Sequence, residues 1–146
     1  MSWRAPGLLG LILLTAGGPV QACLPQAAER YGVPLPLLQA IASVESGHNP
    51  RAVHHNSDGT HDIGLMQINS RWLPVLARHG VTERDLWDPC VNAAVAAGIL
   101  ARHFARWGWT VQALGAYHSP QPARQLAYAR RVLAHWPQQQ VVFHKR

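Results

Sequence analysis

The sequence predicts one globular domain that is mainly α-helical. The chain has 146 residues, of which 48% are apolar, and 13 basic against 7 acidic side chains give it a formal net charge of +6. This composition is typical of a domain with one modest core and excludes a disordered or repetitive chain. Apolar residues recur at helical spacing along most of the chain, and this periodicity predicts the fold class.

The N-terminus has the pattern of a removable export signal. Arg4 supplies a positive start, residues 8–16 form a short apolar run, and Val20-Gln21-Ala22 fits a small-residue cleavage site. The run is too short to span a bilayer comfortably, so we expect a periplasmic protein. The predicted divisions of the chain are a signal peptide over residues 1–22, a mature domain over 23–137 and a loose tail over 138–146.

The chain contains two cysteines, Cys23 and Cys90. An even count in an exported chain favours a disulfide, which would stabilise the domain by about 4 kcal/mol in the chain-entropy model. Two alternatives stay open. Cys23 directly follows the cleavage site, as the acylated cysteine of a lipoprotein does, although Gln21 is an awkward residue for that signal. The two thiols could also remain free and buried.

The first helices follow from periodicity and from the residues that interrupt it. A short helix over residues 24–31 is stopped by Gly32-Val33-Pro34. The second predicted helix has an apolar stripe that includes Leu38 and Ile41. The next position of this stripe is Glu45, so a carboxyl group stands where an apolar residue is expected.

A long polar segment over residues 48–62 follows the second helix. Asn56-Ser57-Asp58-Gly59 is a turn signal, so we expect a loop with a short hairpin. Loops of this length in compact domains are usually functional. The strip over residues 64–69 is short and apolar, and fits either a strand or a helix start.

Helical patterns fill the rest of the chain. Asp88-Pro89 opens the longest predicted helix, which should cross the middle of the domain. Trp107 and Trp136 continue apolar stripes, so we expect both in the core. The predicted segments are residues 72–79, 90–107 and 111–117 and a final helix that buries Leu126, Ala129, Leu133 and Trp136.

Glu45 is the strongest candidate for acid–base chemistry. Most of the other acidic residues have ordinary explanations at turns, helix starts or surfaces. Glu45 continues an apolar stripe near a helix C-terminus, where burial and the helix dipole both raise the pKa of a carboxyl group. A general acid requires a carboxyl group that stays protonated near neutral pH. From the stripe alone, a structural Glu paired with an arginine or reaching solvent remains an alternative.

Metal and nucleic-acid partners are not predicted. Four histidines lie within residues 48–61, but there is no His-Glu-x-x-His motif and neither cysteine lies there, so we expect no metal and no cofactor. The basic residues accompany no nucleic-acid-reading motif. They include Arg102, Arg106, Arg124, Arg130 and Arg131.

Four short motifs occur in order along the chain. Glu45-Ser46 lies at a helix end, and Gly64-Leu65-Met66-Gln67-Ile68-Asn69, Asp88-Pro89-Cys90 and Ala116-Tyr117 follow it. In this combination the chain resembles the soluble lytic transglycosylase (SLT) domain of the lysozyme-like superfamily, over roughly residues 23–136. It is most similar to small exported transglycosylases that accompany type III and type IV secretion, conjugation and pilus systems.

The resemblance implies a lysozyme-like (goose-type) domain. It implies an enzyme that cleaves the β-1,4 bond between N-acetylmuramic acid and N-acetylglucosamine without water and leaves 1,6-anhydro ends. Glu45 matches the catalytic acid of the family, which acts first as acid and then as base. Asp62 is the one acid that competes for this role, and we interpret it as orienting the loop. We expect a monomer whose partners are peptidoglycan strands and components of a secretion, conjugation or pilus apparatus.

Other matching positions imply substrate contacts. Ser46 matches the serine after the catalytic Glu, Met66 and Gln67 match the strip that lines the cleft, and Asn69 closes that strip. Tyr117 matches the tyrosine near the acid. In the secretion-associated subgroup the first mature cysteine pairs with the cysteine of the Asp-Pro-Cys segment, which agrees with the disulfide favoured above.

The sequence departs from the family pattern directly after Tyr117. The family usually continues with Asn, a small residue and Gly, whereas His118, Ser119 and Pro120 stand here. We therefore include His118, in place of the asparagine, among the expected substrate-binding residues. Two alternative functions stay open: a non-catalytic peptidoglycan-binding or assembly protein on the same scaffold, and a hydrolytic muramidase in which water attacks.

Overall fold

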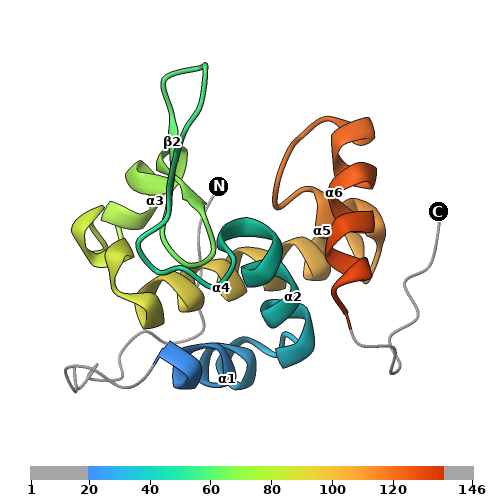
Figure 1. Cartoon of the computed structure of the whole chain (residues 1–146), viewed down its shortest axis with the longest axis horizontal. Helices are drawn as coiled ribbons and strands as arrows, with labels where there is room; N and C mark the ends of the chain where they lie inside the picture. Colours follow the sequence, from blue (N-terminus) through green and yellow to red (C-terminus); the bar gives the residue numbers. More distant parts are fainter. Residues whose placement is uncertain (1–19, 137–146) are drawn as a thin grey trace.

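The longest helix, α4 (Pro89–Trp107), runs through the middle of the fold, and the other elements pack around it (Figure 1). The computed structural model describes residues 20–136. The apolar run of the predicted signal peptide and the predicted tail lie outside these residues. Asp88 caps α4 by accepting hydrogen bonds from the backbone N–H groups of Cys90 and Val91. The fold is mainly α, as the sequence predicts.

Helix α1 (Val20–Tyr31) packs along α4. It begins before the predicted start at residue 24 and inside the segment assigned to the signal peptide. Cys23 is buried on this helix and forms a disulfide with Cys90 at the start of α4. The disulfide therefore joins the first described helix to the central one.

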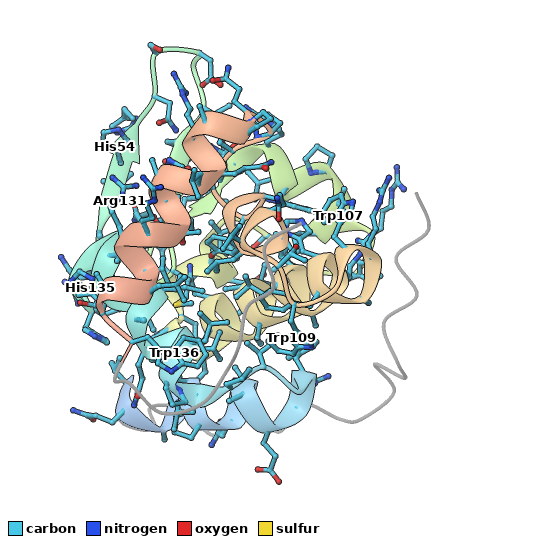
Figure 2. The ribbon with its side chains drawn as sticks, turned by 90° about the vertical axis from the view of Figure 1, so that its right-hand side faces the viewer. His54, Trp107, Trp109, Arg131, His135 and Trp136 are labelled. Carbon is cyan, nitrogen blue, oxygen red and sulfur yellow. A yellow bond between two sulfur atoms is a disulfide. The ribbon has the colours of Figure 1, made fainter. Side chains whose placement is uncertain are left out.

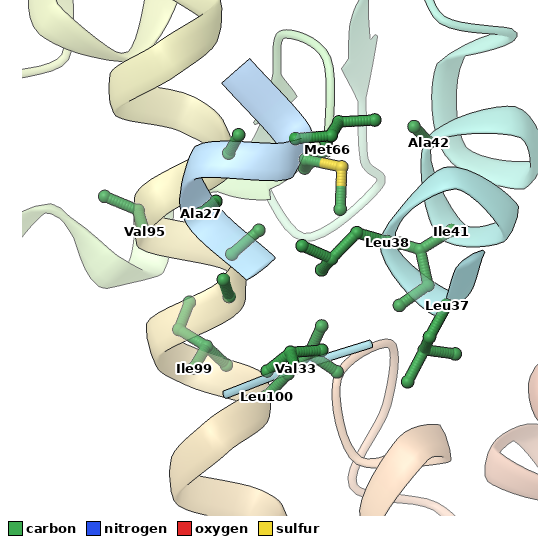
Figure 3. Packing of buried hydrophobic residues seen from close by; sticks show 14 of the residues in the cluster. Ala27, Val33, Leu37, Leu38, Ile41, Ala42, Met66, Val95, Ile99 and Leu100 are labelled. Atoms are coloured by element: carbon green, nitrogen blue, oxygen red, sulfur yellow. The ribbon is translucent and has the colours of Figure 1, made fainter. Parts of the chain in front are cut away.

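Helix α2 (Leu35–Ser46) inserts an apolar face into the core and ends at the site. Leu37, Leu38 and Ile41 are fully buried, and Figure 3 shows them in one packed cluster with residues of α1 and α4. Gly47 stops the helix in the left-handed conformation, with φ of 60°. Glu45 is thereby held in the last turn of a buried helix.

The polar segment forms a small antiparallel sheet in the order β1 (Val53–His55), β2 (His61–Ile63) and β3 (Ile68–Asn69). The hairpin of β1 and β2 extends outward from the body of the molecule (Figure 1). In the register, Asp62 pairs with His54 on one side and with Asn69 on the other. The ambiguous strip over residues 64–69 is thus a buried turn that leads into a short strand.

The remaining elements are helices that follow the sheet or follow α4. Glycine at position 115 is required where α5 meets α6, because a Cβ atom there would collide with Gln125. None of the helices within residues 20–136 is both long and apolar enough to cross a membrane. The elements are η1 (Ser70–Trp72), α3 (Leu73–Ala77), η2 (Arg84–Trp87), α5 (Val111–Gly115) and α6 (Pro122–Ala134).

Two predictions about burial are wrong. Trp107 was expected in the core but is 42% exposed, because α4 extends beyond the core and Trp107 is its last residue. The final helix buries Tyr128, Ala129 and Val132, whereas Leu126 is 39% exposed. The predicted stripe on α6 is thus wrong at Leu126, whereas Leu133 and Trp136 are partly buried against the core. Tyr128 and Val132 complete the buried face, which packs toward α2 and α5.

Candidate active site

A cleft of about 1020 Å³ separates the β hairpin from α5 and α6, and Glu45 lies in its lining. His54 on the hairpin and Trp107 at the end of α4 also line it. Figure 2 shows these two residues on opposite sides of the α6 ribbon, with Arg131 on the same side as His54. The cleft therefore extends from the hairpin to the end of α4 and can hold an extended ligand. Glu45 lies in its lining at the end of α2.

Burial raises the pKa of Glu45 from its ordinary value of 4.5 to about 7. The negative charge of Asp62 adds to the rise, whereas the hydroxyl group of Tyr128 and the charge of Arg131 reduce it. At neutral pH the carboxyl group is thus divided between its protonated and ionised forms. Such a group can donate a proton and accept one back within a reaction cycle.

Tyr128 is a site residue that the sequence reading missed. It is fully buried on α6, and its hydroxyl group has no partner within strict hydrogen-bonding distance among the described residues. The acceptor that it faces is the Glu45 carboxyl group, whose ionised form it favours. The spacing of apolar residues on α6 could have predicted its burial, because Tyr128 lies four residues before Val132 and therefore on the same helix face.

Tyr117 joins the helical side of the cleft to the strip beside the hairpin, and Gln67 fixes that strip to the start of the hairpin. The Tyr117 hydroxyl donates a hydrogen bond of 2.7 Å to the backbone oxygen of Met66. Gln67 adopts a left-handed backbone conformation with φ of 53°, and its side-chain Nε2 donates to the backbone oxygens of Ala52 and Gly64. A non-glycine residue rarely adopts this conformation. The hydrogen bonds around Gln67 therefore hold its backbone in a strained position.

The carboxylate of Asp62 is held by two asparagine side chains. Asn69 donates to one oxygen at 2.8 Å, and Asn56 donates to the other at 3.0 Å. Asn69 also donates to Thr60, so the β strands are tied together along the cleft wall. Asp62 therefore lines the cleft with both carboxyl oxygens engaged in hydrogen bonds.

Two of the expected substrate-binding residues are not among those that line the cleft. The Met66 side chain is fully buried, and only its backbone oxygen takes part, as the acceptor for Tyr117 (Figure 3). Ser46 Oγ donates to the backbone oxygen of Leu65 at 2.6 Å and accepts from the Asn49 N–H. Ser46 thus fastens the end of α2 to the strip beside it. Gln67, Asn69, Tyr117 and His118 line the cleft with Glu45.

Comparison with known proteins identifies the family. The sequence profile described as the transglycosylase SLT domain matches residues 22–130. The chain belongs to the transglycosylase SLT family. The match spans the segments that carry all four sequence motifs, and the family is one of lytic transglycosylases with a lysozyme-like fold.

Relatives of the SLT domain come from enteric bacteria. The chain is 41% identical over 98 residues to the invasion protein IagB of Salmonella typhimurium, covering 66% of this chain and 61% of IagB. It is 40% identical to protein IpgF of Shigella flexneri over 98 residues, with 66% of this chain and 64% of IpgF covered. A peptidoglycan-binding-like protein of Escherichia coli O157:H7 is 33% identical over 136 residues, which cover 85% of this chain and 81% of that protein.

The SLT domain departs from its family pattern at His118, and the structure shows where the substitution lies. The His118 ring stacks on the Tyr128 ring, with centroids 4.7 Å apart and planes 1° from parallel. Burial and the charges of Arg131 and Arg124 lower the pKa of the imidazole. An aromatic ring therefore covers the tyrosine that faces Glu45, on the solvent side of the cleft.

Within residues 20–136, no three His, Cys, Asp or Glu side chains gather in the manner of a metal site. His61 instead bonds Glu83 at 2.9 Å, which ties the hairpin to the segment before η2.

Proposed function

We propose that this SLT domain is an active lytic transglycosylase that cleaves the β-1,4 bond between N-acetylmuramic acid and N-acetylglucosamine in peptidoglycan. The observation that carries the proposal is Glu45, a carboxyl group with a pKa of about 7 that opens into a long cleft. Membership of the family supports the choice of substrate and reaction. We assign substrate contacts to Gln67, Asn69, Tyr117 and His118.

In the proposed first step, protonated Glu45 gives its proton to the glycosidic oxygen as the bond to the anomeric carbon breaks. The leaving N-acetylglucosamine unit departs with a free 4-hydroxyl group. Glu45 is then a carboxylate, which the Tyr128 hydroxyl group stabilises. The Tyr128 hydroxyl group suits this role, because its hydrogen bond to Glu45 strengthens when the Glu45 carboxyl group becomes negatively charged.

In the second step, the C6 hydroxyl group of the muramic acid attacks the anomeric carbon and passes its proton to the Glu45 carboxylate. The ring closes as a 1,6-anhydro sugar, and Glu45 returns to its protonated form without consuming water. One carboxyl group therefore serves both steps. Asp62 is fixed by Asn69 and Asn56, which supports a positioning and electrostatic role for it rather than nucleophilic attack.

The relatives also support a cellular setting. One is named an invasion protein and another a peptidoglycan-binding-like protein. We infer that the enzyme is exported to the periplasm as a monomer and opens the wall locally for a secretion, conjugation or pilus apparatus. A secretion signal over residues 1–22 is consistent with this setting.

The test is mass spectrometry of muropeptides released from purified peptidoglycan, with Glu45→Gln as the variant. We expect anhydromuropeptides from the wild type and at least a thousandfold slower release from Glu45→Gln, because the general acid and base are removed together. Glu29→Gln, which changes an exposed acid on α1, is the matched control and should retain full activity.

Other products would identify the other functions. Reducing muramic acid ends would show that water attacks and that the enzyme is a muramidase. Binding to peptidoglycan without release would show a binding or assembly protein. Unchanged activity of Glu45→Gln would contradict the assignment of the acid.

A further inference from the structure

The segment that departs from the family pattern connects α5 to α6 through its own hydrogen bonds. The backbone N–H groups of His118 and Ser119 both donate to the Gly115 oxygen, at 3.0 and 3.1 Å. Ser119 is buried, and its backbone oxygen accepts a hydrogen bond of 3.0 Å from the Gln125 side chain on α6. His118 is thereby held at a defined place beside α6, the helix that carries Tyr128.

The position of Tyr128 depends on the packing of its ring. The residue is fully buried, and its hydroxyl group has no partner within strict hydrogen-bonding distance in the described part of the chain. The Tyr117 ring lies 6.4 Å from the Tyr128 ring, and the Arg131 guanidinium lies 5.8 Å from its centroid. The His118 ring lies at 4.7 Å and is 1° from parallel. Of these three contacts, His118 makes the shortest, and it limits how far the Tyr128 ring can tilt.

The His118 ring brings little positive charge to this contact at neutral pH. Burial and the charges of Arg131 and Arg124 lower the pKa of the imidazole, whereas the charge of Asp62 acts in the opposite direction. A neutral imidazole stacks on a phenol ring as other aromatic rings do. Phenylalanine is therefore the nearest substitute for the ring. Asparagine, the usual residue of the family, keeps a polar group and loses the ring.

We propose that His118 is a positioning residue, whose ring holds the Tyr128 ring so that the Tyr128 hydroxyl group stays against the Glu45 carboxyl group. The inference rests on the proposed function, because it adds a residue to the reaction that Glu45 performs. A hydroxyl group that is fixed in advance stabilises the carboxylate without rearrangement during the reaction. This role is separate from the substrate contact assigned to His118, which requires a ring nitrogen and not the ring face.

The first test measures the pKa of Glu45 in the free protein by carbon-13 NMR with labelled glutamate. The chain has three glutamates, so few signals must be assigned. The Tyr128 hydroxyl group lowers the pKa of Glu45, so a displaced hydroxyl group raises it. Loss of the His118 ring also changes the exposure of Glu45 to water. A double-mutant cycle with Tyr128→Phe removes this second effect, because it occurs with and without the hydroxyl group.

The cycle compares His118→Asn in the wild-type background and in the Tyr128→Phe background. We expect the acid dissociation constant of Glu45 to fall about threefold further in the wild-type background, where there is a hydroxyl group to displace. His118→Phe keeps a ring and should leave the constant close to that of the wild type. Equal shifts in the two backgrounds, or the same shift in His118→Phe as in His118→Asn, would overturn the inference.

His48→Asn is the matched control. It makes the same exchange at an exposed histidine that does not line the cleft. Asparagine readily adopts the left-handed backbone conformation of this position, where φ is 63°. The acid dissociation constant of Glu45 should be unchanged in this variant. A shift as large as that of His118→Asn would show a general effect of losing a histidine and would contradict the assignment.

The second test is the kinetics of release from purified peptidoglycan. His118→Asn should lower kcat about tenfold with KM unchanged, because the group that stabilises the Glu45 carboxylate is displaced while a polar side chain remains for the substrate. His118→Phe should retain kcat. A loss confined to KM in His118→Asn, or an equal loss of kcat in both variants, would show that the ring face has no role in the reaction.

The two tests separate this inference from the proposed function. The NMR measurement requires neither substrate nor turnover, so it decides whether His118 acts on Glu45 through Tyr128 even in a domain that only binds peptidoglycan. If anhydromuropeptides are released and the two backgrounds give equal pKa shifts, the proposed function stands and the positioning role of His118 is wrong.

Discussion

Asn92 and Glu45 are both polar side chains in the interior of one small domain, and their surroundings are opposite. Asn92 is completely buried on α4, and each of its polar atoms is engaged. Its Oδ1 accepts from the Met66 N–H at 2.8 Å, and its Nδ2 donates to the backbone oxygens of Ile63 and Leu86. Glu45 faces a tyrosine hydroxyl group that has no partner at strict distance.

The difference separates a group that stabilises the fold from one that is proposed to react. The Asn92 bonds fix the strip that carries Gln67 and the acceptor for Tyr117, and Gly64 is required there because a Cβ would lie 2.6 Å from Asn92 Nδ2. A satisfied polar group stabilises the fold and has no reason to change its protonation. A poorly satisfied carboxyl group raises its own pKa and remains available to react.

The largest effect is expected from Asn92→Leu. The substitution leaves the Met66 N–H and the Ile63 and Leu86 oxygens buried without partners, at about 1–3 kcal/mol each. We expect a loss of roughly 4 kcal/mol in the free energy of unfolding, measured by urea denaturation. Asn49→Leu, at an exposed asparagine, should cost about 1 kcal/mol or less. A small loss in Asn92→Leu would show that the strip is held in place by other contacts.

Glu45→Gln should instead increase the free energy of unfolding relative to the wild type at high pH, and the size of this effect should depend on pH. The folded state binds the Glu45 proton more tightly than the unfolded state, so this group stabilises the wild type below pH 4.5 and the contribution is lost as pH rises through about 7. Glutamine has no charge to bury. The stability of the variant relative to the wild type should therefore rise by about 3 kcal/mol between pH 4 and pH 8. A difference that does not change with pH would contradict the raised pKa.

The two tyrosines provide the smallest and sharpest test. Tyr117→Phe removes a bond to the Met66 oxygen and should cost about 1 kcal/mol. Tyr128→Phe removes an unpartnered buried hydroxyl and should gain up to about 1 kcal/mol when Glu45 is protonated. Because Tyr128 lowers the pKa of Glu45, its loss should also move the alkaline limb of the pH–rate profile upward. If both variants lost the same free energy of unfolding, the proposed difference between the two tyrosines would be wrong.

The sequence by itself determined the helical class, the central helix and the candidate acid. Asp88-Pro89 is a local start signal, and the apolar period of α4 and of α2 depends only on spacing along the chain. Glu45 was identifiable because a carboxyl group interrupted such a period. The two cysteines likewise indicated the disulfide that the structure contains.

Only the tertiary structure decided which neighbours the acid meets. Tyr128 reaches Glu45 from a helix more than eighty residues later, and the buried face of α6 depends on the positions of α2 and α5. Met66 turned into the core and Trp107 out of it, because burial is set by what packs against a residue and not by its own hydrophobicity.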